Sequence, residues 1–153
     1  MNLVNTLEQV FATNFQVYYR THVAHVNIVG RNFVSDHKQL QKIYEELQSN
    51  IDSLAEILRT LRTMMPASLS TVLDLSIVSD SEVEGTAEEL LQLVYDDLET
   101  MIDLYQELVI AADDEDHTEI SNFAQDQMTT LRRHCWQLRS VLEERTELEE
   151  EYE

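Results

Sequence analysis

Apolar residues recur every three or four positions along most of this chain, the spacing that puts side chains on one face of an α-helix. The 153 residues include only 2 glycines and 1 proline, and 43% are hydrophobic, which favours long uninterrupted helices over a sheet with many turns. This length suits a single domain, residues 1–153, with a substantial core. We expect an all-α fold whose main helices cover residues 5–29, 34–64, 86–112 and 117–144.

Helix breakers and capping residues predict where these helices begin and end. Gly30 interrupts the first apolar stripe, and Pro66 marks the end of the second helix. Each helix start has a side chain that can accept a hydrogen bond from a free backbone N–H, and two starts carry the glutamate of a capping box three residues later. The expected capping residues are Asn5, Asn32, Thr86 and Asp116.

Residues 67–85 lack the helical spacing and are rich in serine, so we expect them to form the crossover between the second and third helices. They contain too many apolar residues for a free linker, which predicts a short helix packed on the bundle; a lid or binding segment is the alternative. The last helix has an apolar stripe that includes Trp136, and we expect this side chain to be buried. The apolar residues of the crossover are Leu69, Val72, Leu73, Leu75 and Ile77.

The charge balance is strongly acidic, with 10 basic residues against 30 acidic ones and a net charge of −20. Binding to nucleic acid phosphates draws chiefly on clustered lysine and arginine, so we expect no direct nucleic acid binding. No Lys or Arg precedes Arg20. The acidic tail, residues 145–153, has little to bury, and we expect it to be a frayed helix or a disordered segment.

Few features of the sequence bear on localisation. There is no run of about 18 apolar residues, so we expect no membrane span, and the N-terminus lacks the basic region of a signal peptide. The single cysteine, Cys135, excludes an internal disulfide framework and fits a reducing compartment. We therefore expect a cytoplasmic protein.

Two histidines and two carboxylates carry the candidate chemistry of the chain. His25 and His37 flank the first helix break, and Asp52 and Glu56 follow in the second helix. Imidazole and carboxylate together suit iron, zinc or manganese. His22 lies on the same apolar stripe as His25, where a hydrogen-bonded structural histidine is the main interpretation and a metal ligand the alternative.

The spacing of these residues argues against a metal site within one chain. Asp52 and Glu56 are four apart and project from one face of a helix, so they can share an ion. His37 lies fifteen residues before Asp52, which corresponds to about 22 Å along a helix at a rise of about 1.5 Å per residue. If the long helix packs antiparallel against its copy, the histidine end of one subunit meets the carboxylate end of the other. A two-fold dimer would then hold two identical sites, each built from both chains.

The same residues resemble a known family. The pattern His-x-Asn-x-x-Gly-x-x-Phe-x-x-x-His over residues 25–37, followed by Asp52 and Glu56, looks like that of the Dps-type mini-ferritins. A second match is Trp-Gln-Leu-Arg at residues 136–139, similar to the Trp-x-Leu-Arg of that family. The resemblance covers roughly residues 5–142.

This resemblance implies a ferritin-like four-helix bundle that assembles as a homo-oligomer, a hollow dodecamer built from two-fold dimers. It also implies that ferrous iron is oxidised, by hydrogen peroxide, at inter-subunit sites and stored as ferric iron, which protects against oxidative damage. The ligands matched by position are His25 and His37 from one chain and Asp52 and Glu56 from the other. Zinc and manganese are alternative occupants.

Two departures from the family pattern change this expectation. The family usually has a carboxylate four residues after its second histidine, where this chain has Gln41, and a tryptophan after its first histidine, where it has Val26. A neutral amide supplies no charge to hold a second cation. We therefore expect one firm iron site and a weakened or absent neighbour.

Acidic residues at the junction of the third and fourth main helices are candidates for a pore that admits cations, since such residues line three-fold pores in ferritin-like shells. The DNA-binding role of some family members is not expected, because the basic terminal tail is missing. The alternative function is a structural or partner-binding bundle in which a residual metal site holds the dimer together. The pore candidates are Asp113, Asp114, Asp116, Glu119 and Asp126.

Overall fold

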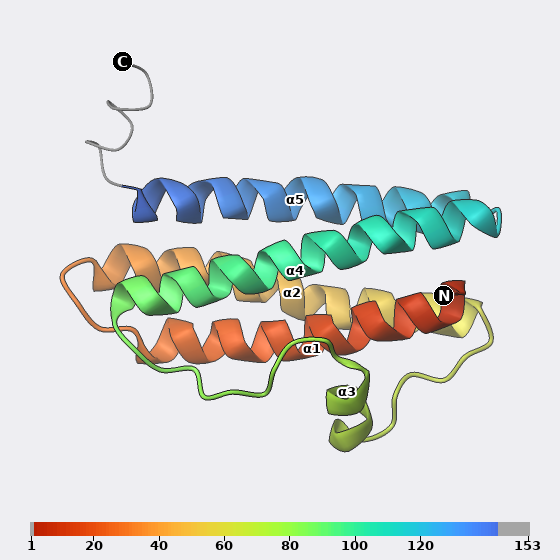
Figure 1. The fold of residues 1–153 in the computed structure, drawn as a ribbon, viewed down its shortest axis with the longest axis horizontal. Helices are drawn as coiled ribbons and strands as arrows, with labels where there is room; N and C mark the ends of the chain where they lie inside the picture. Colours follow the sequence, from red (N-terminus) through yellow and green to blue (C-terminus); the bar gives the residue numbers. More distant parts are fainter. Residues whose placement is uncertain (1, 144–153) are drawn as a thin grey trace, which may run out of the picture.

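The computed structural model describes residues 2–143 and folds them into two antiparallel helix pairs that pack side by side (Figure 1). The first pair is α1 and α2, the second pair is α4 and α5, and a long crossover carrying the short helix α3 joins them. This arrangement confirms the expected all-α bundle of four long helices with a short helix in the crossover, and the described residues contain no strand. The helices are α1 (Leu3–Asn27), α2 (Phe33–Thr60), α3 (Leu69–Leu75), α4 (Ala87–Asp114) and α5 (Thr118–Leu142).

The apolar stripes predicted from the sequence form the core. Each long helix contributes side chains that are almost fully buried, and the largest of these are Tyr105 and Phe11. Full burial of one apolar side chain such as Phe11 stabilises the fold by roughly 1.5–3 kcal/mol. The central residues of the stripes include Leu7 and Val10 of α1, Leu40, Leu47 and Leu54 of α2, Leu98 and Met101 of α4, and Leu131 and Leu138 of α5.

Three of the four expected helix caps differ in the structure. α1 begins two residues earlier than expected, because its N-cap is Asn2 rather than Asn5. The Asn2 side chain accepts a hydrogen bond from the backbone N–H of Asn5 over 2.8 Å. Asn32 stands at the N-cap position of α2, yet its side chain makes no capping bond to any described residue. The Thr86–Glu89 capping box is confirmed in both directions.

α2 and α4 both end in a backbone motif that we did not predict from the sequence. α2 ends at Thr60, well before Pro66, because Arg62 takes the left-handed conformation with φ of +60° and Thr63 N–H donates to Leu58 O. Asp116, the expected cap of α5, adopts the same φ after α4, and His117 N–H donates to Ala112 O. These are Schellman motifs, which satisfy the free carbonyls of a helix end. The N-cap of α5 is therefore His117 rather than Asp116.

The crossover is held against α1 by a row of polar side chains. Thr13 accepts a hydrogen bond from the backbone N–H of Ile77, and Gln16 accepts one from the hydroxyl of Ser76. Within α3, Val72 is buried, whereas Leu69, Leu73 and Ile77 of the crossover are exposed. The expected short helix is thus present and packs on α1, and Leu75 of α3 also packs, partly buried, against the core.

Trp136 does not lie in the core. Its side chain is 56% exposed on α5, which corrects the expectation that the last helix buries it, while Cys135 beside it is buried. The residue is at the edge of the apolar stripe, and the helix turns its ring outward. The acidic tail, residues 145–153, lies outside the residues that the structure describes.

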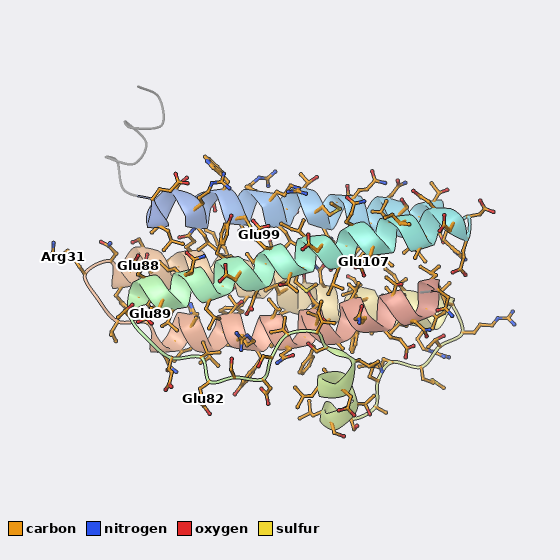
Figure 2. The ribbon with its side chains drawn as sticks, viewed as in Figure 1. Arg31, Glu82, Glu88, Glu89, Glu99 and Glu107 are labelled. Carbon is orange, nitrogen blue, oxygen red and sulfur yellow. The ribbon has the colours of Figure 1, made fainter. Side chains whose placement is uncertain are left out.

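Acidic side chains are spread along the outer surface of the bundle. Glu88 and Glu89 lie at the start of α4, and Glu99 and Glu107 follow along the same helix, while Arg31 projects from the turn between α1 and α2 (Figure 2). Within residues 2–143, no helix is both long and apolar enough to cross a membrane.

Candidate metal centre

His25 and His37 lie together where α1 ends and α2 begins. Gly30 has a φ of +142°, a conformation that L side chains rarely adopt, and it lets the chain turn back so that the two helices run antiparallel. The two imidazole rings stack with centroids 3.7 Å apart and an interplanar angle of 17°. Sequence spacing alone placed both residues near this turn, and the structure brings their rings into contact.

Each of these two histidines is oriented by the backbone of the other. Nδ1 of His25 lies 2.7 Å from the carbonyl oxygen of His37, and Nδ1 of His37 lies 2.7 Å from the carbonyl oxygen of His25. A carbonyl oxygen can only accept, so both Nδ1 atoms carry the proton and donate it. In the neutral imidazole the lone pair is then on Nε2. Metal-binding histidines commonly have this tautomer, with the other ring N–H held by a hydrogen-bond acceptor.

Burial keeps His25 in the neutral form that binds metals. The residue is 6% exposed, and its desolvation lowers the pKa, against the opposing effect of the hydrogen bond to His37. A metal ion competes with a proton for Nε2, so a lowered pKa favours the metal.

A cluster of aromatic rings surrounds the histidine pair. The Tyr44 ring contacts His25 edge to face at 4.9 Å, and Phe33 stacks on His37 at 5.0 Å. His22 stacks on Tyr44 at 4.1 Å and bonds the hydroxyl of Tyr18 through Nδ1 over 3.0 Å. These contacts agree with the structural interpretation of His22.

Asp52 and Glu56 are exposed side chains on α2, one turn apart. They lie four and five turns of helix beyond His37, so in a single chain they stay apart from the histidines. Among residues 2–143, no group of three or more His, Cys, Asp or Glu side chains is arranged to hold a metal ion. The four predicted ligands are therefore present in two separate pairs.

Glu45 and Tyr44 belong to the surroundings of this site and were not predicted to do so. Gln41, in the place of the family carboxylate, donates from Nε2 to Glu45 Oε1 over 2.8 Å. The negative charge of Glu45 acts on His25 and is a small opposing influence on the lowered pKa of that imidazole. Spacing could have indicated Glu45, because residues 37, 41 and 45 follow one another at single helical turns. The position of Tyr44 between His22 and His25 could not be predicted from the sequence.

The five acidic pore candidates are all exposed near the junction of α4 and α5. Asp113 and Asp114 lie in the last turn of α4, and Asp116 is in the turn itself. Glu119 accepts a hydrogen bond from Nδ1 of His117 over 3.0 Å, and this bond lowers the pKa of its carboxyl. Asp126 stands farther along α5. Their role at a pore stays a prediction.

Comparison with known proteins identifies the class of this bundle. The model of the ferritin-like domain family matches residues 4–147. A DNA protection during starvation protein of Brevibacillus brevis is 28% identical over 83% of this chain and 85% of its own length. The structure of CAIP from Helicobacter cinaedi superposes with a TM-score of 0.86 at 29% identity, and covers 93% of this chain and 100% of its own.

A third comparison agrees with this fold. The Dps protein of Vibrio cholerae O1 is described as a member of a broad superfamily of ferritin-like diiron-carboxylate proteins, and it superposes with a TM-score of 0.87 at 24% identity over 92% of this chain and 89% of its own. The match of the family model over residues 4–147 shows that the chain belongs to the ferritin-like family, and the relatives agree with a mini-ferritin of the Dps type. This family implies iron binding, iron storage and protection.

Proposed function

We propose that this protein oxidises ferrous iron with hydrogen peroxide at sites shared by two subunits, and that it stores the ferric product in a hollow dodecameric shell. The observation that carries the proposal is the reciprocal pair of hydrogen bonds between His25 and His37. Two imidazoles with both Nδ1 protons engaged present two Nε2 lone pairs that are oriented in advance, which reduces the cost of binding a metal ion.

The remaining ligands would come from a second copy of the chain. The face of α2 that carries Asp52 and Glu56 is polar and exposed, and it is available to a partner. An antiparallel pairing of two α2 helices sets His37 of one subunit beside the two carboxylates of the other and repeats the contact by two-fold symmetry. Two neutral imidazoles and two carboxylates suit iron, and the carboxylate charges favour the ferric state.

The chemistry is a transfer of electrons from iron to peroxide. Each ferrous ion gives one electron, and one hydrogen peroxide molecule takes two electrons as its O–O bond breaks to give two hydroxide ions. The ferric ions then hydrolyse and collect as mineral. The net charge of −20 per chain would concentrate ferrous ions around the shell, and the acidic residues at the α4–α5 junction are the proposed route of entry.

The second candidate function is a non-catalytic bundle in which a metal ion, iron, zinc or manganese, only holds the dimer together. The bond from Gln41 to Glu45 favours it, because a neutral amide, itself hydrogen-bonded to Glu45, stands where the family usually has a carboxylate. The two candidates differ in turnover, since a catalytic site consumes peroxide in proportion to ferrous iron and a purely structural site binds metal and stops.

An anaerobic ferrous titration followed by peroxide tests the proposal. Ferric absorbance and particle size are followed together on the purified protein. We expect rapid oxidation on a large particle that retains the iron. A large particle that oxidises no iron would retain the fold assignment and exclude the catalytic function, and a dimer that binds zinc and oxidises nothing would favour the structural candidate.

A further inference from the structure

The outward side of α5 carries an exposed tryptophan flanked by arginines, and we call it the arginine–tryptophan face: Arg132, Arg133, Trp136 and Arg139. The arginines stand four and three positions before Trp136 and three positions after it, spacings that put them on the same side of the helix. All four side chains are exposed. Tryptophan and arginine are enriched at the residues that dominate binding energy in interfaces, so this face has the composition of a docking surface.

The charge of this face is an exception in a strongly acidic chain. Its three arginines are among 10 basic residues in a sequence with 30 acidic ones, and no Asp or Glu lies between Asp126 and Glu143. Among residues 2–143, no ion pair includes Arg132 or Arg133. A guanidinium binds a carboxylate through two parallel N–H donors. The face therefore suits an acidic segment.

The groove between α5 and α2 gives such a segment room at one edge of the face. A cavity of about 410 Å³ lies beside Arg133 and is also lined by Lys42, Glu45 and Glu46. Both glutamates are already bonded to other side chains of the bundle. Lys42 and Arg133 form no ion pair with a described residue, so the groups of this cavity that await a partner are the cations.

The sequence that follows α5 has the matching charge. Residues 144–153 contain six glutamates and one arginine, and they include the apolar side chains of Leu148 and Tyr152. Glu143, the residue before them, already pairs with Arg139, with Oε1 3.6 Å from Nε. Its φ of −77° and ψ of 138° end the helix at this point. The last described glutamate of the chain thus already binds an arginine of the face.

We propose that residues 144–153 dock on the arginine–tryptophan face of their own subunit, with glutamates paired to Arg132 and Arg133 and an apolar side chain over Trp136. Arg132 lies eleven residues before Glu143, roughly 17 Å back along α5. Six residues of extended chain span up to about 20 Å, so the run that begins at Glu149 reaches both arginines.

A tether makes this contact effective although each exposed ion pair is weak by itself. A segment joined to the helix by a few residues binds as if present at about millimolar concentration, and several weak pairs form together. The rest of a chain with a net charge of −20 repels the segment, which leaves the arginine–tryptophan face as its landing place. The docked segment is then a built-in competitor that closes this face to other polyanions, independently of the iron chemistry.

Fluorescence tests the proposal directly, because Trp136 is the only tryptophan of the chain. The probe is acrylamide, a neutral quencher whose access does not depend on protein charge. Deletion of residues 144–153 should shift the emission to longer wavelength and raise quenching about twofold, as expected if the docked segment covers half of the ring surface. Salt at about 1 M, where the Debye length is about 3 Å, should move the wild type toward the truncated protein.

A second variant keeps the length of the chain and removes only the charge of the segment. It should be quenched as strongly as the truncated protein, and its substitutions are Glu147→Gln, Glu149→Gln, Glu150→Gln and Glu151→Gln. A matched control removes the same charge from exposed acids of the crossover and α4, and it should behave as the wild type. The control substitutions are Asp80→Asn, Glu82→Gln, Glu84→Gln and Glu88→Gln.

Equal quenching in the wild type and the truncated protein would overturn the proposal. Strong quenching in both would show that nothing covers Trp136, and weak quenching in both would show that a second copy of the chain covers it. Co-assembly of truncated subunits with full-length Trp136→Phe subunits checks which subunit provides the segment. The tryptophans then belong to truncated subunits alone and should stay strongly quenched, whereas protection would mean that the segment docks on a neighbouring copy.

Discussion

Arg20 of α1 and Asp97 of α4 form a buried ion pair, with Nε of the guanidinium 2.8 Å from Oδ2 of the carboxylate. The same guanidinium donates to the carbonyl oxygens of Ser79 and Ser81 in the crossover, over 3.1 and 3.2 Å. One side chain thus ties α1, α4 and the crossover together. Burial raises the pKa of the Asp97 carboxyl although Arg20 acts against the rise, so this pair carries a substantial desolvation cost.

Removal of one partner of this pair should destabilise the protein strongly. Asp97→Ala leaves a buried guanidinium without its counter-ion, and we expect a loss of about 3–5 kcal/mol in the free energy of unfolding, measured by urea denaturation at fixed protein concentration. The double variant Arg20→Met/Asp97→Leu should lose less than either single variant. The control Asp96→Ala changes an exposed neighbour and should stay within about 0.5 kcal/mol of wild type. Equal losses in Asp97→Ala and Asp96→Ala would contradict this account.

Mixed subunits should reveal whether the iron site is shared by two chains. The variants His25→Ala/His37→Ala and Asp52→Ala/Glu56→Ala should each fail to oxidise iron. Co-assembled in equal amounts, they form mixed dimers in which one site has four intact ligands and the other has none. Random pairing then restores about a quarter of the wild-type sites, as two-fold symmetry requires. If the mixture stays inactive while its shells assemble normally, the inter-subunit assignment is wrong.

We expect the number of cations bound at the proposed site to depend on whether residue 41 carries a negative charge. Gln41→Asp places a carboxylate one turn from His37, and we expect anaerobic titration to find a second ferrous ion per subunit. Without metal, the new like-charge pair with Glu45 should cost about 0.2–0.5 kcal/mol of stability, and added metal should reverse the loss. Gln39→Asp makes the same change on another side of α2 and should leave the metal stoichiometry unaltered.

Cys135 should resist modification in the folded protein. Burial raises the pKa of its thiol to about 11, and only the thiolate attacks an alkylating reagent. Each pH unit below the pKa cuts the thiolate about tenfold, so labelling by iodoacetamide at pH 8 should be slow in the native state and faster in urea, where the reference pKa is about 8.5. The native rate should rise with pH toward 11. Native labelling as fast as that in urea would show that the thiol is accessible.

The left-handed residue after α2 predicts a stabilising substitution. Arg62 has a φ of +60°, which costs an L-residue roughly 1–2 kcal/mol and costs glycine almost nothing. Arg62→Gly should therefore raise the free energy of unfolding by up to about 1 kcal/mol. Arg59→Gly makes the same replacement in the last turn of α2 and should lower it, by less than the roughly 1 kcal/mol that glycine costs in a helix interior. A loss of stability in both variants would mean that Arg62 makes contacts that outweigh its strain.

Local patterns predicted the elements better than their ends. The Thr86–Glu89 capping box was confirmed because both partners lie within one turn of the chain. Pro66 and Asp116 were misjudged as boundaries because α2 and α4 end in Schellman motifs, in which a non-glycine residue accepts a positive φ. The exposure of Trp136 was missed for a related reason, since a residue at the edge of a stripe is turned inward or outward by the packing of its neighbours.

The sequence by itself determined the all-α bundle and predicted two pairs of candidate ligands, because helical periodicity and residue spacing are properties of residues close together in the chain. Only the tertiary structure decided how the candidate side chains are oriented. The protons on Nδ1 of His25 and His37, the stacking of Tyr44 between His22 and His25, and the pairing of Arg20 with Asp97 all join residues on different helices. Such contacts depend on how the helices pack and rotate against each other, which no local pattern encodes.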